Sequence, residues 1–426
     1  MQKLSGKSLL LVSFTLFSMF FGAGNLIFPP HLGAQAGVNL WPAFAGLAVS
    51  AVGLPIAGVV AVARAGGLDK LAGRVHPVFA MVFTILVYLS IGPCLAIPRT
   101  ASTSFQMLVP LIGGGTGLQL GYSAVFFAAA FLVALRPEKL TDWLGRILCP
   151  SLIVLIVVLF AGCLIHPLAA HYGTPSAEYA ALPAVQGILY GYQTMDTLAG
   201  LNFGAVIALN IRARGVTESR AVEGGTIRAG FIAGGLLLVV YAMLGHAGAE
   251  TGTVYPGLAT GAEVLTALAQ QLFGRAGLVL IAAIFVIACF NTCVGLIACV
   301  GQYFHQLLPR IPYPALAAFF AVASMLVSNL GLAAIIRLST PVLNAIYPAA
   351  IVLILLSFMP GLEKHRAVYP LCMGLTALQS IAAALPLGAV SAAANALPLG
   401  SMGFGWVLPA LAGLAGGLLL NKSDLQ

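Results

Sequence analysis

Charged residues are scarce in this chain. Asp, Glu, Lys and Arg make up 7% of the 426 residues, whereas hydrophobic residues make up 60%. Because charged residues account for roughly 25% of an average soluble domain, this composition excludes a soluble globular protein and predicts a polytopic membrane protein. The formal net charge is +8. The basic residues are scattered between apolar runs, so membrane topology explains them better than nucleic-acid binding does.

Sequence signals for catalysis are also missing. The chain has no glycine-rich phosphate loop and no long polar insertion, which argues against an attached ATP-hydrolysing domain. No Ser/His/Asp or paired-carboxylate arrangement occurs at membrane depth, so we expect neither an enzyme nor an organic cofactor. All seven cysteines lie inside or at the ends of apolar runs. This placement favours buried small side chains over disulfides or a zinc site.

Long apolar runs dominate the chain instead. A membrane-crossing helix needs about 20 residues, and the apolar runs predict spans at residues 8–36, 41–63, 77–98, 117–135, 147–165, 184–210, 229–247, 277–302, 315–334, 339–358, 367–386 and 403–420. A polar extension at residues 99–106 can lengthen the third helix. With both termini in the cytoplasm, the inner loops hold all but three of the 19 basic residues, the exceptions being Arg99, Arg275 and Arg337. This bias supports twelve spans in that orientation.

The first apolar run contains residues that weaken a helix. Its centre, residues 20–30, reads FFGAGNLIFPP. Two near-adjacent glycines and two prolines without amide donors predict an interruption at membrane depth. Lipid cannot satisfy the exposed backbone groups, so the break must face protein or a wet cavity. The predicted ligand-binding residues at this break are Gly22, Ala23, Gly24 and Asn25.

A second interruption is predicted in the sixth run. Residues 189–204 read LYGYQTMDTLAGLNFG and place Asp196 where a lipid-facing helix carries leucines. An ionised aspartate at the bilayer centre costs at least about 2.5 kcal/mol, so Asp196 must face an interior partner or a water path, or be protonated. No basic residue lies deep within a predicted span, which favours a role in the substrate or proton path. Breaks in spans one and six are typical of transporters built from inverted repeats.

The eighth run adds a third group of polar residues. Ala288, Asn291, Thr292 and Gly295 follow helical spacing and share one face. Their side-chain oxygens, together with backbone carbonyls freed at the first break, suit a hard monovalent cation. The alternative for Asn291 and Thr292 is hydrogen bonding between helices.

Four segments of the chain resemble one transporter family. Residues 13–37, SFTLFSMFFGAGNLIFPPHLGAQAG, closely resemble the opening of the bacterial branched-chain amino acid transport system II carriers, the BrnQ-like leucine/isoleucine/valine:cation symporters. Residues 91–101, 191–204 and 290–297 are also similar to segments of that family. The resemblance implies a LeuT-like fold of the amino acid–polyamine–organocation superfamily, in a single transporter domain. Residues 8–165 and 184–358 would be inverted repeats of five spans each, with discontinuous helices 1 and 6, and residues 367–420 would be two peripheral helices.

The resemblance also implies roles for individual residues. Amides at the first break would bind the substrate carboxylate, the second break would bind the ammonium group, and span eight would bind sodium. Tyr88 and Met195 are candidates for an apolar pocket. The family's span eight tends to carry two consecutive threonines, whereas this chain has Asn291 before Thr292. The expected substrate residues are Gly22, Ala23, Gly24, Asn25, Tyr88, Gly191, Gln193, Thr194, Met195 and Asp196, and the expected sodium residues are Ser18, Phe21, Ala288, Asn291 and Thr292.

The implied activity is sodium-driven symport of leucine, isoleucine and valine into a bacterium across its inner membrane. Two alternatives stay open at this point. One is a proton-coupled amino acid carrier of the same fold in which Asp196 titrates, and the other is a membrane channel or receptor.

Overall fold

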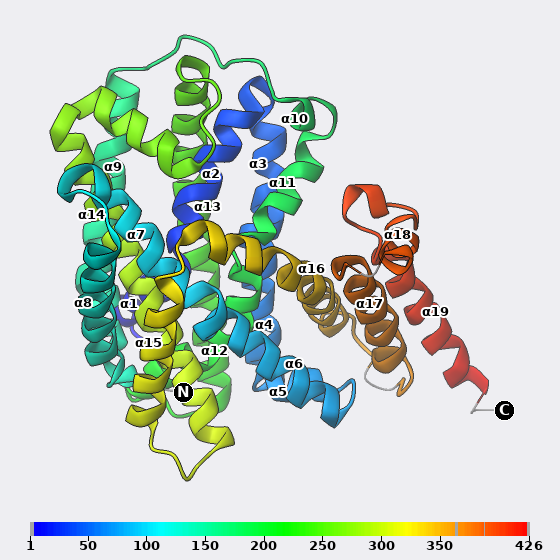
Figure 1. Ribbon diagram of the computed structural model, residues 1–426. Helices are drawn as coiled ribbons and strands as arrows, with labels where there is room; N and C mark the ends of the chain where they lie inside the picture. Colours follow the sequence, from blue (N-terminus) through cyan, green and yellow to red (C-terminus); the bar gives the residue numbers. More distant parts are fainter. Residues whose placement is uncertain (1–3, 363–364, 387, 424–426) are drawn as a thin grey trace.

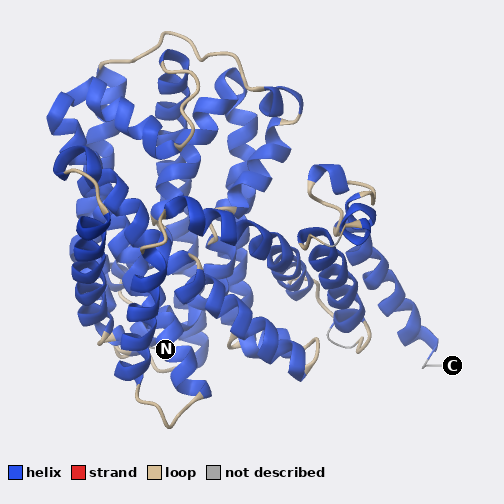
Figure 2. Ribbon diagram, in the orientation of Figure 1, coloured by secondary structure: helices blue, strands red, loops and turns tan. Residues whose placement is uncertain are grey.

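The computed structural model describes residues 4–362, 365–386 and 388–423. All regular structure within these residues is helical (Figure 2), which confirms the all-α prediction. Each predicted span coincides with one helix or with consecutive helices. By length and apolarity, seven helical segments of the described chain can cross a membrane, or eight if a bent pair counts as one, and four shorter apolar helices accompany them. Lys3 and Lys364, both assigned to the cytoplasmic side, lie outside the described residues.

Most helices follow one another with short connections, and a longer loop joins α9 to α10 (Figure 1). The first half comprises α1 (Gly6–Phe20), α2 (Ala23–Ala36), α3 (Leu40–Ala48), α4 (Leu54–Ala65), α5 (Leu68–Gly73), α6 (Pro77–Leu89), α7 (Ala96–Ile112), α8 (Thr116–Ala134) and α9 (Cys149–Ile165). The remainder comprises α10 (Ala177–Ala181), α11 (Pro183–Tyr192), α12 (Asp196–Arg212), α13 (Ser219–Val254), α14 (Gly261–Leu307), α15 (Tyr313–Ser328), α16 (Leu332–Ser357), α17 (Val368–Ala384), α18 (Ala389–Asn395) and α19 (Val407–Ser423).

Polar residues define where several helices begin. At the start of α14, Thr260 Oγ1 accepts a hydrogen bond of 3.2 Å from the N–H of Glu263. His76 Nδ1 accepts one of 3.2 Å from the N–H of Val78 at the start of α6, where Pro77 occupies the first helical position. Such residues satisfy or avoid the unpaired amides of a first helical turn. The starts of α6 and α14 are therefore encoded locally.

The break in the first span lies between α1 and α2, at Phe21 and Gly22. Gly22 has an extended backbone, with φ −120° and ψ −154°. A Cβ on Gly22 would lie 2.6 Å from Thr292 Oγ1, so only glycine allows α14 to approach the break this closely. Ala23, Gly24 and Asn25 form the first turn of α2. The unwound part is therefore narrower than predicted, and these three residues place their free amides at a helix N-terminus.

The break in the sixth span separates α11 from α12, which are bent by 48° relative to one another. Met195 adopts the left-handed conformation with φ 65° immediately before α12. This conformation costs a non-glycine residue about 1 kcal/mol or more and persists only where the surrounding structure imposes it. Met195 is buried at the cavity between the two breaks. The strain therefore lies at the predicted ligand site.

Helix α2 packs closely against α13 because small residues line the contact. A Cβ on Gly248 would lie 2.0 Å from the carbonyl oxygen of Pro30, and a Cβ on Gly33 would lie 2.0 Å from that of Gly245. The two backbones thus touch directly, as small residues allow in membrane helices. This contact connects the second half of the broken first span to the long seventh span.

The C-terminal helices lie to one side of the bundle (Figure 1). Helix α17 packs between α16 and α19, and α18 packs against α17. The two breaks lie within the main bundle, in contact with α7, α13 and α14. The C-terminal helices therefore do not contribute to the cavity between the breaks, which is described next.

Candidate functional site

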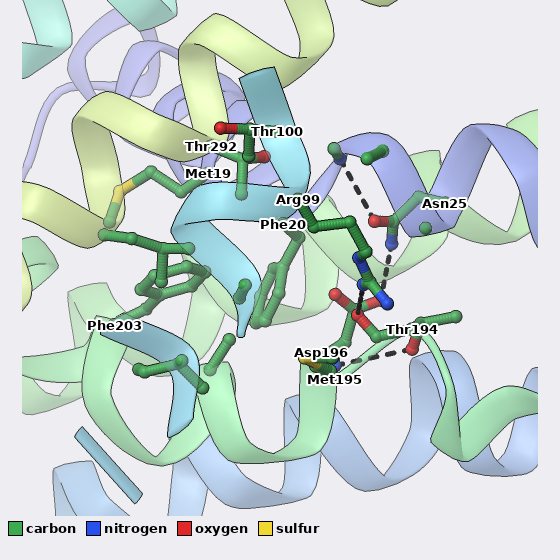
Figure 3. A pocket seen from close by; sticks show the side chains of 17 residues that line it. Met19, Phe20, Asn25, Arg99, Thr100, Thr194, Met195, Asp196, Phe203 and Thr292 are labelled. Carbon is green, nitrogen blue, oxygen red and sulfur yellow. Dashed lines mark hydrogen bonds between the residues drawn. The ribbon is translucent and has the colours of Figure 1, made fainter. Parts of the chain in front are cut away.

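A small cavity lies between the two broken helices (Figure 3). Its volume is about 30 Å³, room for a water molecule or two, since one water needs roughly 10–15 Å³. Helices α7 and α14 complete its walls. Eight residues predicted as substrate or sodium ligands line it, namely Gly22, Ala23, Gly24, Asn25, Thr194, Met195, Asp196 and Thr292.

A buried hydrogen-bond network connects the two breaks. Asn25 Nδ2 donates to Asp196 Oδ2 at 2.5 Å and also contacts the hydroxyl of Tyr241. That hydroxyl donates to the same Asp196 oxygen at 3.1 Å, and the N–H of Gly22 donates to Asn25 Oδ1 at 3.0 Å. The three side chains are buried. The network fixes the carboxyl group of Asp196 at the first turn of α12 and joins α2, α12 and α13 at the level of the breaks.

Arg99 is the cationic residue of the cavity. Its guanidinium donates to the carbonyl oxygen of Gln193 at 3.1 Å and to that of Thr194 at 3.5 Å, at the end of α11. The group also lies 5.8 Å from the centre of the Phe28 ring. A Cβ on Gly24 would lie 2.9 Å from Arg99 Nη2, so the glycine makes room for the guanidinium. Arg99 therefore bridges α2 and the second break, as Figure 3 shows.

The sequence-based placement of Arg99 outside the membrane-spanning part is wrong. The side chain is 5% exposed, and α7 continues past it to Ile112. A basic residue does lie deep within a span. The role of Asp196 in the substrate or proton path therefore cannot be inferred from the absence of such a residue. The missed signal was the polar stretch at residues 99–106, which lengthens the helix as anticipated. Its face Arg99, Thr100 and Thr103 is buried inside the bundle rather than exposed.

Helix α14 meets the first break through the predicted cation ligands. Asn291 Nδ2 donates to Ser18 Oγ at 3.3 Å, and Thr292 Oγ1 lies 3.5 Å from the carbonyl oxygen of Ser18. The Oδ1 atom of Asn291 is buried without a hydrogen-bond partner. A buried oxygen without a partner is costly, unless it binds an ion or water. Hydroxyl, amide and carbonyl oxygens of this kind suit a hard cation such as sodium.

The other predicted residues have different surroundings. Phe21 lies at the first break with its ring stacked on Phe17, and Ala288 is buried one turn before Asn291. Gly191 packs against Ser50, since a Cβ there would lie 2.0 Å from Ser50 Oγ.

Two predictions for the substrate pocket are corrected by the structure. The ring of Tyr88 stacks on Tyr303 with centroids 4.0 Å apart, because α6 presents this residue to α14 and not to the breaks. Gln193 lines a separate cavity of about 300 Å³ together with Asn344 and Gln379, and only its carbonyl faces Arg99. Neither side chain lines the cavity between the breaks.

Comparison with known proteins identifies the family. Residues 5–424 match the sequence model of a family described as branched-chain amino acid transport protein. The chain belongs to this family. Members of the branched-chain amino acid transport protein family that it resembles include a branched-chain amino acid permease, BraB, of Bacillus subtilis, which is 39% identical over 97% of this chain and 96% of its own length. The branched-chain amino acid transport system 2 carrier protein of Pseudomonas aeruginosa is 42% identical over 85% of this chain and 83% of its own length.

Solved structures confirm the fold of this family member. The nucleobase-cation-symport-1 family transporter Mhp1, in a closed conformation, matches with a TM-score of 0.63 and 13% identity, over 97% of this chain and 93% of its own. A Na⁺-coupled sialic acid symporter matches with a TM-score of 0.61 and 12% identity, over 96% and 89% of the two chains. The predicted LeuT-like fold with discontinuous first and sixth spans is thus confirmed. The chain is a multi-pass membrane transporter and not an enzyme.

Proposed function

We propose that this branched-chain amino acid transporter is a sodium-coupled symporter that imports leucine, isoleucine and valine across the bacterial inner membrane. The observation that carries the proposal is the convergence of two interrupted helices on one buried cavity, with a cluster of oxygen atoms beside one of them. The two curated relatives named above are a branched-chain amino acid permease and a branched-chain amino acid carrier. The scattered basic residues favour cytoplasmic termini.

The two charged groups of the substrate bind to different residues of the cavity in this proposal. The N-terminus of α2 and the Arg99 guanidinium form the positive pole, which receives the carboxylate. Asp196 forms the negative pole, which receives the ammonium group together with the hydroxyl of Thr194. The backbone carbonyls of the second break, expected to bind the ammonium, already accept hydrogen bonds from Arg99. In this proposal the ammonium group is therefore bound by side chains of the second break and not by its backbone carbonyls.

The aliphatic side chain of the substrate has an apolar wall available. Met19, Phe20 and Phe203 line the same cavity, and the rings of Phe20 and Phe203 pack edge to face with centroids 5.0 Å apart. Burying a leucine or isoleucine side chain contributes roughly 1.5–3 kcal/mol. This wall favours branched aliphatic residues over polar ones.

Sodium binds between α1 and α14 in this proposal. Its ligands are Asn291 Oδ1, Thr292 Oγ1 and the carbonyl of Ser18, with carbonyls near Phe21 and Ala288 completing the shell. Gly22 packs against Thr292 and also donates to Asn25 in the network of Asp196. An ion that holds α14 against the first break therefore stabilises the arrangement that binds the substrate, which makes each ligand favour the other.

Transport then requires the cavity to change shape. A volume of about 30 Å³ is too small for an amino acid, so its walls must separate on one side to admit the substrate and on the other to release it. We propose that residues 8–165 and 184–358 act as inverted repeats for this alternating access and that residues 367–420 are peripheral.

A single uptake experiment tests the coupling ion. Purified protein in proteoliposomes is given labelled leucine with an inward sodium gradient at equal pH, or with an inward proton gradient at equal sodium. Accumulation with the sodium gradient alone supports the proposal. Accumulation with the proton gradient that is indifferent to sodium overturns it and favours proton coupling, for which the buried carboxyl of Asp196 is the candidate group.

A further inference from the structure

Three potential metal ligands meet at the end of the bundle opposite the N-terminus. Cys163 lies near the end of α9, and His246 and Glu250 lie one turn apart on α13. One ligand atom of each residue lies within 4.8 Å of the other two. Cys163 and Glu250 are buried, and His246 is 21% exposed. In Figure 1 the loop after α9 crosses this end of the bundle, whereas the chain begins at the other end.

The spacing of these atoms suits a zinc ion. Glu250 Oε2 lies 3.2 Å from Cys163 Sγ, and Glu250 Oε1 lies 3.3 Å from His246 Nε2. Zinc bonds of about 2.0–2.3 Å in a tetrahedron place the ligand atoms roughly 3.3–3.6 Å apart. Each distance is close to the spacing of ligand atoms around zinc. The two distances involve different oxygens of Glu250, so the carboxylate would bind a shared ion through both oxygens or, after a rotation, through one.

The orientation of His246 supports a ligand role. Its Nε2 atom is buried and makes no hydrogen bond, although a carboxylate oxygen lies 3.3 Å away. The other ring nitrogen, Nδ1, is 2.6 Å from the hydroxyl of Tyr172. Histidine ligands in metal sites are held in this manner by a partner on the second nitrogen, which fixes the tautomer. Nε2 is thus the nitrogen left to bind a metal.

We propose that Cys163, His246 and Glu250 form a zinc site, with water as the fourth ligand. The backbone N–H of Leu168 donates to Glu250 Oε2 at 3.1 Å and holds the carboxylate in place. Leu168 also lines a cavity of about 430 Å³ next to this hydrogen bond. The sequence did not indicate zinc, because Cys163 lies far from the other two ligands along the chain.

The site connects a metal to the transport machinery through α13. This helix carries Tyr241, which donates to Asp196, and it packs directly on α2. An ion that joins α9 to α13 restricts the movement of α13. Zinc added at the end of the bundle where the three ligands lie should therefore slow uptake. This consequence rests on the proposed function, whereas binding of the metal does not.

Metal binding is tested on the purified full-length protein without substrate. Cobalt is titrated as a spectroscopic substitute for zinc, and a thiolate-to-cobalt charge-transfer band with one equivalent of bound metal is expected. C163S should lose the band, and H246Q should weaken cobalt binding at least tenfold. C94S, which removes an exposed cysteine elsewhere, should bind cobalt as the unmodified protein does. Absence of the band in the unmodified protein, or an unchanged band in C163S, overturns the proposal.

Uptake provides the second measurement. Zinc should slow leucine uptake by the unmodified protein and by C94S, and H246Q should need at least tenfold more zinc for the same effect. If cobalt binds in the titration but zinc does not affect uptake, the proposed effect on transport through α13 is refuted, whereas the metal site itself is supported. Equal zinc sensitivity of H246Q would show that inhibition arises at another site. If C163S does not fold, the cobalt affinity of H246Q decides, because His246 is the most exposed of the three ligands.

Discussion

At the level of single residues, Arg99 changes the chemistry expected of the cavity. The last carbonyls of a half-helix carry a partial negative charge and are open to a donor, so a cation at this position is stabilised. Arg99 supplies that cation from within the protein. The cavity therefore contains a fixed positive group beside the N-terminus of α2 and a carboxyl group at the N-terminus of α12. A zwitterion is complementary to this pair.

The role of Arg99 leads to a first prediction. R99Q should weaken leucine binding about tenfold or more, because a hydrogen bond to a charged group contributes roughly 1.5–3 kcal/mol. R99K should bind with intermediate affinity, since lysine retains the charge but not the planar fork of donors. Equilibrium binding of labelled leucine measures the effect. R337Q is the matched control, because Arg337 is exposed on α16. Equal affinity in R99Q and R337Q would remove Arg99 from the site.

A second prediction concerns the cation ligands. T292A should lower sodium affinity about tenfold or more while the protein stays folded, since it removes one oxygen near the first break. The sodium concentration that gives half-maximal leucine binding is the quantity to measure. T266A is the control, because Thr266 lies on the part of α14 before its kink at Gly274, away from the break, and its hydroxyl contacts Met107. An unchanged sodium dependence in T292A would exclude this hydroxyl as a ligand.

Residue types at the two breaks were predictable, but their partners were not. Gly22, Asn25 and Asp196 stand out because polar or flexible residues are costly in lipid. Tyr241 and Arg99 do not, because a tyrosine within an apolar run and an arginine beside one look like ordinary interfacial residues. Only the packing of α7 and α13 against the breaks brings Arg99 to the cavity and the Tyr241 hydroxyl to Asp196.

At the level of elements, the two breaks have different causes. Pro29 and Pro30 were expected to help interrupt the first span, yet both lie inside α2. The interruption lies before the prolines, at Gly22, where Thr292 of α14 is in close contact with the backbone. In the second break, Met195 takes a left-handed backbone that its sequence does not favour. The sequence therefore located each break to within a few residues, whereas its exact bounds depend on tertiary contacts.

The close packing at the start of α2 supports a third prediction. G24L should abolish leucine binding, because a Cβ on Gly24 would lie 2.9 Å from Arg99 Nη2 and 3.3 Å from the Cα of Thr194. The larger side chain must displace the guanidinium or the second break. G235L is the control, since Gly235 on α13 has open space around it. Comparable thermal unfolding of both variants would show that G24L is folded, and retained leucine affinity in G24L would refute a binding role for this turn.

At the level of the whole molecule, the distribution of apolar runs predicted the all-helical fold and the order of the apolar segments along the chain. The pattern succeeds because each span must bury about 20 apolar residues and pair its own backbone groups. Contacts between helices that are distant in the sequence produce no comparable pattern of residues along the chain. The cluster of Cys163, His246 and Glu250 is an example, since it forms only when α9 and α13 lie side by side. Secondary structure and the order of the helices were thus accessible from the sequence, whereas sites built from distant segments were not.

Coupling between the two ligands gives a prediction for the complete transporter. If sodium raises leucine affinity by some factor, leucine must raise sodium affinity by the same factor, because the coupling free energy is shared. We expect a factor of about 5–150, the range that couplings of 1–3 kcal/mol produce. Leucine binding at several sodium concentrations, and sodium binding at several leucine concentrations, give the two factors independently.

The same pair of titrations tests the path through Gly22. The network from Thr292 through Gly22 and Asn25 to Asp196 connects the sodium ligands to the substrate carboxyl site. N25A removes the side chain that accepts from Gly22 and donates to Asp196, yet it leaves both proposed sodium side chains in place. It should therefore bring both factors towards one while sodium still binds. Factors that remain equal to those of the unmodified protein would show that the two sites communicate by another route.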